Sequence, residues 1–177
     1  MKKIIVLLIV LIIIISFLIS GCFLIFPKKH DKLISFYSKE YVVDKSVVAS
    51  VINIESSYKS DVISNAGAVG LMQLLPTTAF DCARRLKIEI TEDDLFKEEI
   101  NIKLGVFYLS YLLNMFDNNI INTLCAYNWG LQNVKEWIEL GNVENDGTIS
   151  NIPINETKNY LKKFRLNYFI YKNIYKY

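Results

Sequence analysis

The sequence predicts an all-α, or nearly all-α, fold in which one globular domain follows an apolar N-terminal segment. Apolar residues recur at intervals of three and four through most of the chain after residue 32, which is the period of a helix with one buried face. No segment of convincing length alternates apolar and polar residues as a half-exposed strand does. The length of 177 residues is ordinary for a single domain.

The N-terminal segment is set apart by its composition. Residues 4–26 are apolar except for two serines and a glycine, and as a helix these 23 residues at ~1.5 Å each would span a hydrocarbon core of ~30 Å. Ile19-Ser20-Gly21-Cys22 also fits the short pattern that precedes a lipidated cysteine. We therefore interpret residues 1–26 either as a transmembrane signal anchor or as a lipoprotein signal lipidated at Cys22. In both cases the segment takes no part in the fold, and the domain is tethered to the extracytoplasmic face of the cell membrane.

The domain, residues 33–177, follows a short stem of residues 27–32. Its first predicted helix covers Leu33–Tyr41, and Asp44 or Ser46 can cap a second helix. Residues 57–70 are polar and contain glycine, so they are predicted to form a loop.

Further helices are predicted from Pro76, placed at a first helical position, to about Leu86, and then over Leu95–Met115, Ile120–Trp129 and Leu131–Leu140. Gly141 is a plausible residue just past the end of the last of these. After a loop over residues 141–153, one more helix carries an apolar stripe that we interpret as core packing. The stripe consists of Leu161, Phe164, Tyr168, Tyr171 and Tyr175.

Charge and residue types exclude several classes of function. Four lysines before residue 31 account for the net charge of +2, and the rest of the chain holds 16 basic and 18 acidic residues without a basic stripe. Nucleic acid is therefore not expected as a partner. The only histidine, His30, lies in the stem, so a His-dependent triad is not expected, and no cysteine pair has zinc-ligand spacing. Cys82 and Cys125 are interpreted as small buried residues, with a disulfide between them as the alternative. No metal or other cofactor is expected.

Glu55 suggests chemistry before any family is considered. On a helix it shares a face with Val48, Val51 and Ile52. Apolar surroundings raise the pKa of a carboxyl group by desolvation, and a carboxylic acid still protonated near neutrality can act as a general acid in glycosidic cleavage. The alternative is an ordinary solvent-exposed glutamate near a helix end, and Glu55 alone would favour that alternative.

Four segments in a fixed order change this interpretation. They are Glu55-Ser56-Ser57-Tyr58 with residues 64–79 (SNAGAVGLMQLLPTTA), residues 101–109, Ala126-Tyr127-Asn128-Trp129-Gly130, and Glu156-Thr157 with Tyr160. Together they resemble the lytic transglycosylase (SLT) family, over roughly residues 33–177. The sequence departs from the family pattern at Trp129, where a small residue is usual, and at Leu75, where methionine is frequent.

The resemblance implies a lysozyme-like helical domain, related to goose-type lysozymes, that acts on peptidoglycan glycan strands. We expect the protein to be a monomer. Glu55 would protonate the bond between N-acetylmuramic acid and N-acetylglucosamine and then act as a base. The substrate's acetamido group would stabilise the cation, and the muramic C6 hydroxyl would give a 1,6-anhydro product without water. The alternatives are a hydrolytic muramidase on the same scaffold and a non-catalytic glycan-binding or assembly protein.

The resemblance also implies substrate-binding residues. Ser64 and Tyr127 would orient the acetamido group or hold the acid, and Met72 and Gln73 would line the groove. Asn128 is either a ligand contact or a buried hydrogen-bonding group. Glu156 either binds substrate, supports Tyr127 or caps the last helix.

Overall fold

The computed structural model describes residues 2–177, apart from the side chains at positions 2, 5, 6, 15, 18–20 and 22. Its helices are α1 (Lys2–Ile25), α2 (Asp31–Glu40), α3 (Lys45–Ser56), α4 (Pro76–Leu86), α5 (Glu98–Met115), α6 (Ile120–Trp129), α7 (Leu131–Glu139) and α8 (Asn155–Phe169). A short 3₁₀ turn, η1 (Asp93–Phe96), precedes α5, and a π-helical turn, η2 (Ile170–Ile174), continues α8. The described residues form no β-strand, only isolated bridges, so the predicted all-α fold is confirmed.

The helix boundaries follow local signals in the sequence. The Asp44 carboxylate caps α3 by accepting a hydrogen bond of 2.8 Å from the Ser46 amide, and Pro76 opens α4 as predicted. Gly141 has a φ of +78° just past the end of α7. The predicted helix from Leu95 is instead divided, because Lys97 adopts an extended backbone conformation between η1 and α5.

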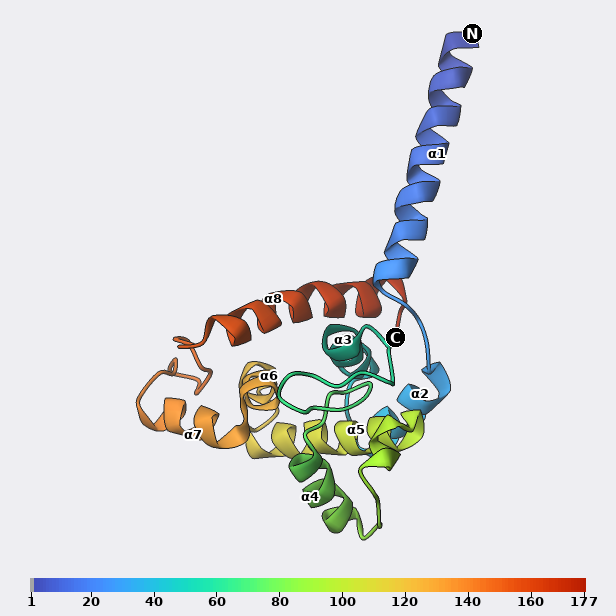
Figure 1. The fold of residues 1–177 in the computed structure, drawn as a ribbon. Coiled ribbons are helices and arrows are strands. Elements are labelled where there is room, and N and C mark those ends of the chain that lie inside the picture. The colour runs from blue at the N-terminus through green and yellow to red at the C-terminus, as the bar shows by residue number, and fades with distance from the viewer. Residues whose placement is uncertain (1) are drawn as a thin grey trace.

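The core lies between two sides of the domain (Figure 1). Helix α5 forms one side and contacts α2, α4 and α6, while α8 covers the other side by packing across α3 and α6. Leu104, Leu109 and Leu112 of α5 are fully buried. Helix α3, which carries Glu55, is therefore held between α2 and α8.

Helix α1 projects away from the domain, yet its end is part of the fold (Figure 1). The Asn53 amide of α3 donates a hydrogen bond of 3.0 Å to the carbonyl of Ile25. The hydroxyls of Tyr175 and Tyr171 donate to the next two carbonyls, those of Phe26 at 2.7 Å and Pro27 at 2.9 Å. The expectation that the apolar segment takes no part in the fold is therefore wrong for its last residues.

The structure bears on the predicted membrane anchor and on the interpretation of the cysteines. Counting only residues that the structure describes, no helix is both long enough and apolar enough to cross a membrane. The side chain of Cys22, the candidate for lipidation, lies outside the described part of the chain. Cys82 and Cys125 are buried and unpaired, as interpreted from the sequence.

Candidate active site

The loop that follows α3 is fastened to the core by Asn101. This side chain is 1% exposed, and its oxygen accepts a hydrogen bond of 2.7 Å from the Met72 amide. Its amide nitrogen donates to the carbonyls of Val69 at 2.9 Å and Leu95 at 2.8 Å. Because all three bonds are buried, Asn101 fixes the position of the loop above α5.

Two glycines allow this loop to approach α5 closely. Gly70 has a φ of +79°, and a Cβ atom there would overlap the Asn101 amide and the Leu95 carbonyl. A Cβ atom at Gly105 of α5 would overlap the Met72 side chain. The loop therefore requires glycine on both sides of its contact with α5.

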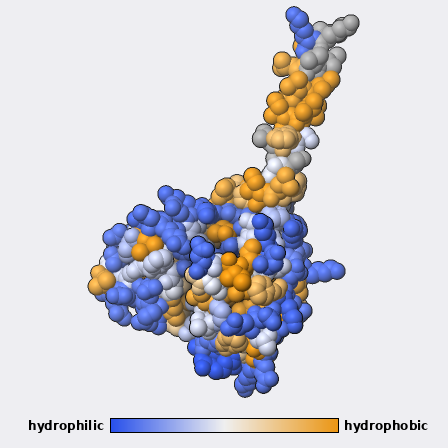
Figure 2. Space-filling model, viewed as in Figure 1, coloured by the Kyte–Doolittle hydropathy of each residue, from blue (hydrophilic) through white to orange (hydrophobic). Residues whose placement is uncertain are grey.

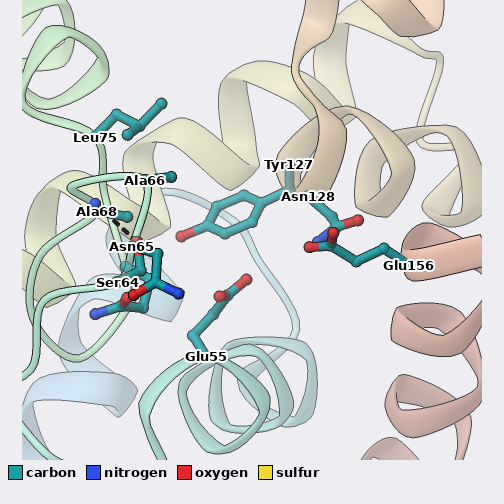
Figure 3. Close-up of a pocket in the computed structure, with 10 residues that line it drawn as sticks. Glu55, Ser64, Asn65, Ala66, Ala68, Leu75, Tyr127, Asn128 and Glu156 are labelled. Atoms are coloured by element: carbon teal, nitrogen blue, oxygen red, sulfur yellow. Dashed lines mark hydrogen bonds between the residues drawn. The ribbon is translucent and has the colours of Figure 1, made fainter. Parts of the chain in front are cut away.

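A cavity of about 500 Å³ opens between this loop, α3, α6 and the first turn of α8 (Figure 3). It is lined by Glu55, Ser64, Asn65, Ala66, Ala68, Gln73, Leu75, Tyr127, Asn128 and Glu156. In the close-up, Glu55 rises from α3 toward the Tyr127 ring, with Ser64 on one side and Glu156 on the other. The fold thus brings together side chains that the sequence separates by up to about 100 positions.

The Glu55 carboxyl is poised to hold a proton near neutral pH. Burial raises its pKa from 4.5 to about 7, and desolvation is the largest cause. The negative charge of Glu156 contributes to this rise, whereas the Tyr160 hydroxyl and the positive charge of Lys163 oppose it. The buried Tyr160 hydroxyl lies near the Glu55 carboxyl and lowers its pKa, although it forms no hydrogen bond of ordinary geometry with a described residue. A carboxyl in this state can donate a proton and take one back.

The Tyr127 hydroxyl is held by the backbone of the loop. It donates a hydrogen bond of 2.7 Å to the carbonyl of Met72, and its ring packs 5.6 Å from that of Tyr108. Burial and the nearby charge of Glu55 raise the pKa of Tyr127 well above its ordinary value. Because its only proton is used by Met72, this hydroxyl can meet the protonated Glu55 or a substrate N–H only as an acceptor.

Ser64 and Gln73 form the loop side of the cavity. The Ser64 hydroxyl oxygen accepts a hydrogen bond of 3.0 Å from the Ala68 amide, which leaves its own proton for another acceptor. The Gln73 amide nitrogen donates to the carbonyls of Gly70 at 2.9 Å and Val62 at 3.2 Å. Those bonds orient the Gln73 side chain, so its amide oxygen is the group available to a ligand.

Comparisons with known proteins agree with this geometry. The family model of the transglycosylase SLT domain matches residues 32–149. The chain belongs to this family. It is 31% identical over 156 residues to the soluble lytic murein transglycosylase of Escherichia coli K12, covering 86% of this chain and 24% of that protein. It is 34% identical over 95 residues to the membrane-bound lytic murein transglycosylase E of Buchnera aphidicola, covering 52% of this chain and 45% of that protein.

The crystal structure of an inactive mutant of the lytic transglycosylase Slt from Pseudomonas aeruginosa has the same fold. It matches with a TM-score of 0.78 and 30% identity, over 85% of this chain and 25% of that one. The present SLT domain therefore spans about a quarter of the length of the larger relatives. The resemblance inferred from the four motifs is confirmed at the level of family and fold.

Most of the predicted site residues lie on the cavity of the SLT domain, but Met72 does not. Glu55, Ser64, Gln73, Tyr127, Asn128 and Glu156 all line it. The Met72 side chain is fully buried against Gly105, and only its backbone serves the site, through the carbonyl that holds Tyr127. Trp129, which departs from the family pattern, is partly buried and does not line the cavity.

The SLT domain has a second, smaller cavity on the other side of Glu55. It measures about 300 Å³ and is lined by Ile54, Glu55, Asn128, Glu156, Asn159, Tyr160 and Lys163. Asn128 belongs to both cavities, and its oxygen accepts a hydrogen bond of 2.8 Å from the buried Thr157 hydroxyl, so its N–H groups are the ones left for a ligand. Glu55 therefore lies where the two cavities meet, and we call the two together the cleft.

Sequence reasoning missed Asn101 and Lys163. The available signal for Asn101 was its place between Ile100 and Ile102, at the start of the segment 101–109 that resembles the family. Lys163 belongs to a run of basic residues, and no local pattern distinguishes the one that faces the cleft from those that face solvent.

Proposed function

We propose that this SLT domain is a peptidoglycan lytic transglycosylase with Glu55 as its single acid and base. The observation that carries the proposal is a glutamate with a pKa of about 7 at the centre of a cleft whose other walls are mostly polar and uncharged. Such walls suit hydroxyl and acetamido groups better than they suit charged or apolar ligands. The named activity of the relatives supports the same conclusion.

In the proposed reaction, protonated Glu55 donates its proton to the glycosidic oxygen between N-acetylmuramic acid and N-acetylglucosamine, and the bond from C1 to that oxygen breaks. The acetamido oxygen of the muramic residue stabilises C1 meanwhile. The Glu55 carboxylate then takes the proton of the C6 hydroxyl, and O6 bonds to C1. One bond breaks, one forms and the proton returns to Glu55, so the 1,6-anhydro product forms without water. Asn128, Ser64 and Gln73 would bind and orient the sugars.

A hydrolytic reaction is the second candidate, because Glu156 places another carboxylate on the same cavity. A hydrolase would use that group to activate water. In the lyase, Glu156 is needed only for binding and for the pKa of Glu55. The two candidates therefore differ in the product and in the response to Glu156→Gln.

The deciding experiment weighs the muropeptides that the full-length protein, in detergent, releases from purified peptidoglycan. The lyase product is one water lighter than the hydrolytic product, and it should remain the product of Glu156→Gln. Glu55→Gln should lose ~10²-fold or more in rate at unchanged helicity, whereas the exposed Glu139→Gln serves as a matched control. Reducing muramic ends would contradict the lyase, and Glu55→Gln with more than about a tenth of the rate would exclude Glu55 as the catalyst.

We further propose that the domain works as a monomer on the extracytoplasmic face of the cell membrane, held there by residues 1–26. The apolar side chains of α1 support this location, since Leu7, Phe17 and Leu24 are each at least 74% exposed and would be costly in water. Attachment is either by α1 itself or by a lipid on Cys22. The mass of the mature protein separates the two, because a lipoprotein loses the residues before Cys22 and gains acyl chains, whereas a helical anchor keeps residues 1–21 and carries no lipid.

A further inference from the structure

The outward-facing side of α8 combines basic residues with large apolar residues. We call this surface the outer face of α8, and it consists of Lys158, Lys162, Arg165, Leu166 and Phe169. Leu166 and Phe169 are each 55% exposed, although the opposite side of the same helix buries Leu161 and Phe164 in the core. Apolar residues on both sides of a surface helix indicate that its outer face has a partner.

The charge of the chain is divided between this region and the rest of the domain. Residues 155–177 contain six basic residues and one acidic residue, whereas residues 31–154 contain ten basic and 17 acidic residues. Lys172 is neutralised by Asp44 at 2.8 Å. None of the three cations of the outer face, by contrast, forms an ion pair with any described residue. This distribution favours an anionic partner on one side of the molecule.

The outer face of α8 lies on the side from which α1 leaves the domain. Figure 1 shows α8 running crosswise to α1 and forming the layer of the domain next to it. In the space-filling view, the apolar surface of α1 reaches down to the domain, where hydrophilic surface adjoins it (Figure 2). The hydrogen bonds from Asn53, Tyr171 and Tyr175 to the end of α1 and the stem keep this arrangement fixed.

We propose that the outer face of α8 binds the surface of a bilayer that contains anionic lipids. Lys158, Lys162 and Arg165 would contact the lipid headgroups, while Leu166 and Phe169 would enter the interface. The proposal rests on the membrane location proposed above, but not on the lyase chemistry. It deepens the proposed function, because a neighbouring side of α8 lines the cleft with Glu156, Tyr160 and Lys163. The cleft is then held alongside the bilayer, where it meets membrane-proximal glycan.

The test uses the full-length protein in vesicles of phosphatidylcholine, alone or with one third phosphatidylglycerol, whose acyl chains are brominated to quench tryptophan. Phe169→Trp places a reporter on the outer face, and Asn114→Trp places a matched reporter at an exposed position of α5. We expect strong quenching of the Phe169→Trp signal in the anionic vesicles, above the background of Trp129 and Trp137, and none for Asn114→Trp. Adding Lys158→Glu, Lys162→Glu and Arg165→Glu should reduce that quenching at least twofold.

Equal signals from the two reporters would overturn the proposal, as would quenching that the charge reversals leave unchanged. If the partner were an anionic wall polymer instead of lipid, Phe169→Trp would stay unquenched in polymer-free vesicles, which also overturns it. The charge-reversed protein should keep its lytic rate on peptidoglycan in detergent, because none of the three residues lines the cleft. Failure of the lyase assignment would appear in the mass of the product, independently of quenching.

Discussion

At the scale of single residues, the burial that raises the pKa of Glu55 also lowers the folding stability of the domain once Glu55 is ionised. The carboxyl is kept in surroundings that favour its protonated form, so above a pH of about 7 the folded protein holds an unfavourable buried charge. A lone glutamate in the sequence does not reveal this, since its desolvation comes from the packing of α3 under the loop and against α8. A carboxyl that stays protonated at neutral pH thus comes with a local cost in folding free energy above that pH.

This conflict predicts a pH-dependent effect of Glu55→Gln on stability. Because the folded-state pKa of about 7 lies above the ordinary value of 4.5, the folded protein binds more protons between those values, and its stability falls as pH rises through that window. Glutamine cannot ionise, so the variant should gain up to ~3 kcal/mol relative to wild type between about pH 4 and about pH 8. Urea unfolding at both pH values measures this gain. A difference that does not change with pH would show that Glu55 ionises alike in the folded and unfolded chains.

At the scale of elements, the site depends on the contact between α5 and the loop. Asn101 holds the loop, the loop presents the Met72 carbonyl, and that carbonyl holds the Tyr127 hydroxyl of α6. Three elements are therefore joined by a chain of hydrogen bonds that begins in the buried core and ends at the cavity. A change in α5 should reach the site although α5 contributes no lining residue.

Asn101→Ala should accordingly destabilise the domain and impair the site. The substitution leaves the Met72 amide and the Leu95 carbonyl buried without partners, at a cost of ~1–3 kcal/mol for each unsatisfied group, while the Val69 carbonyl keeps only the Leu74 amide. We expect a loss of ~3 kcal/mol or more in the free energy of unfolding, together with faster amide exchange across the loop. Asn114→Ala, at an exposed position of the same helix, is the control. A variant within about 0.5 kcal/mol of wild type would contradict this role for Asn101.

At the scale of the whole molecule, the C-terminal tyrosines fix the position of the domain relative to the end of α1. The carbonyls at the end of α1 and in the stem accept no hydrogen bond within a helix. Their donors are the side chains of Asn53 in α3, Tyr171 in η2 and Tyr175 just after η2. Phe26 is buried, and Phe23 stacks on Tyr175 at 5.7 Å. The stem is therefore a fixed joint, where the sequence indicated only a short connection between two independent parts.

Loosening this joint should expose the stem to proteases. The double variant Tyr171→Phe and Tyr175→Phe keeps both rings but removes the hydroxyls that bind Pro27 and Phe26. Each lost hydrogen bond is worth ~1 kcal/mol, so the loss of both should give roughly 30-fold faster trypsin cleavage after the exposed Lys28 and Lys29. Tyr111→Phe, on α5, should cleave at the wild-type rate. Unchanged cleavage of the double variant would mean that other contacts hold the stem.

Local signals in the sequence were sufficient for the helices and for much of the site. Capping by Asp44, the first-turn position of Pro76 and the period of apolar residues depend on neighbours within a few positions, so the boundaries of α3, α4 and α6 agree with prediction. The order of the motifs was enough to indicate the family. The division of the helix at Lys97 was missed because a single extended residue leaves the apolar period intact.

By itself the sequence determined that the chain is helical and that it belongs to the SLT family, and it predicted Glu55 as the catalytic residue. Only the tertiary structure decided that Met72 faces the core, that Asn101 carries the loop and that the end of α1 is joined to the domain. The physical reason is the range of the contacts: Tyr127 and Met72 are 55 positions apart, and Tyr175 and Phe26 are 149 apart. A local pattern encodes which face of a helix is apolar, but the partner of a buried polar group is set by how distant elements pack.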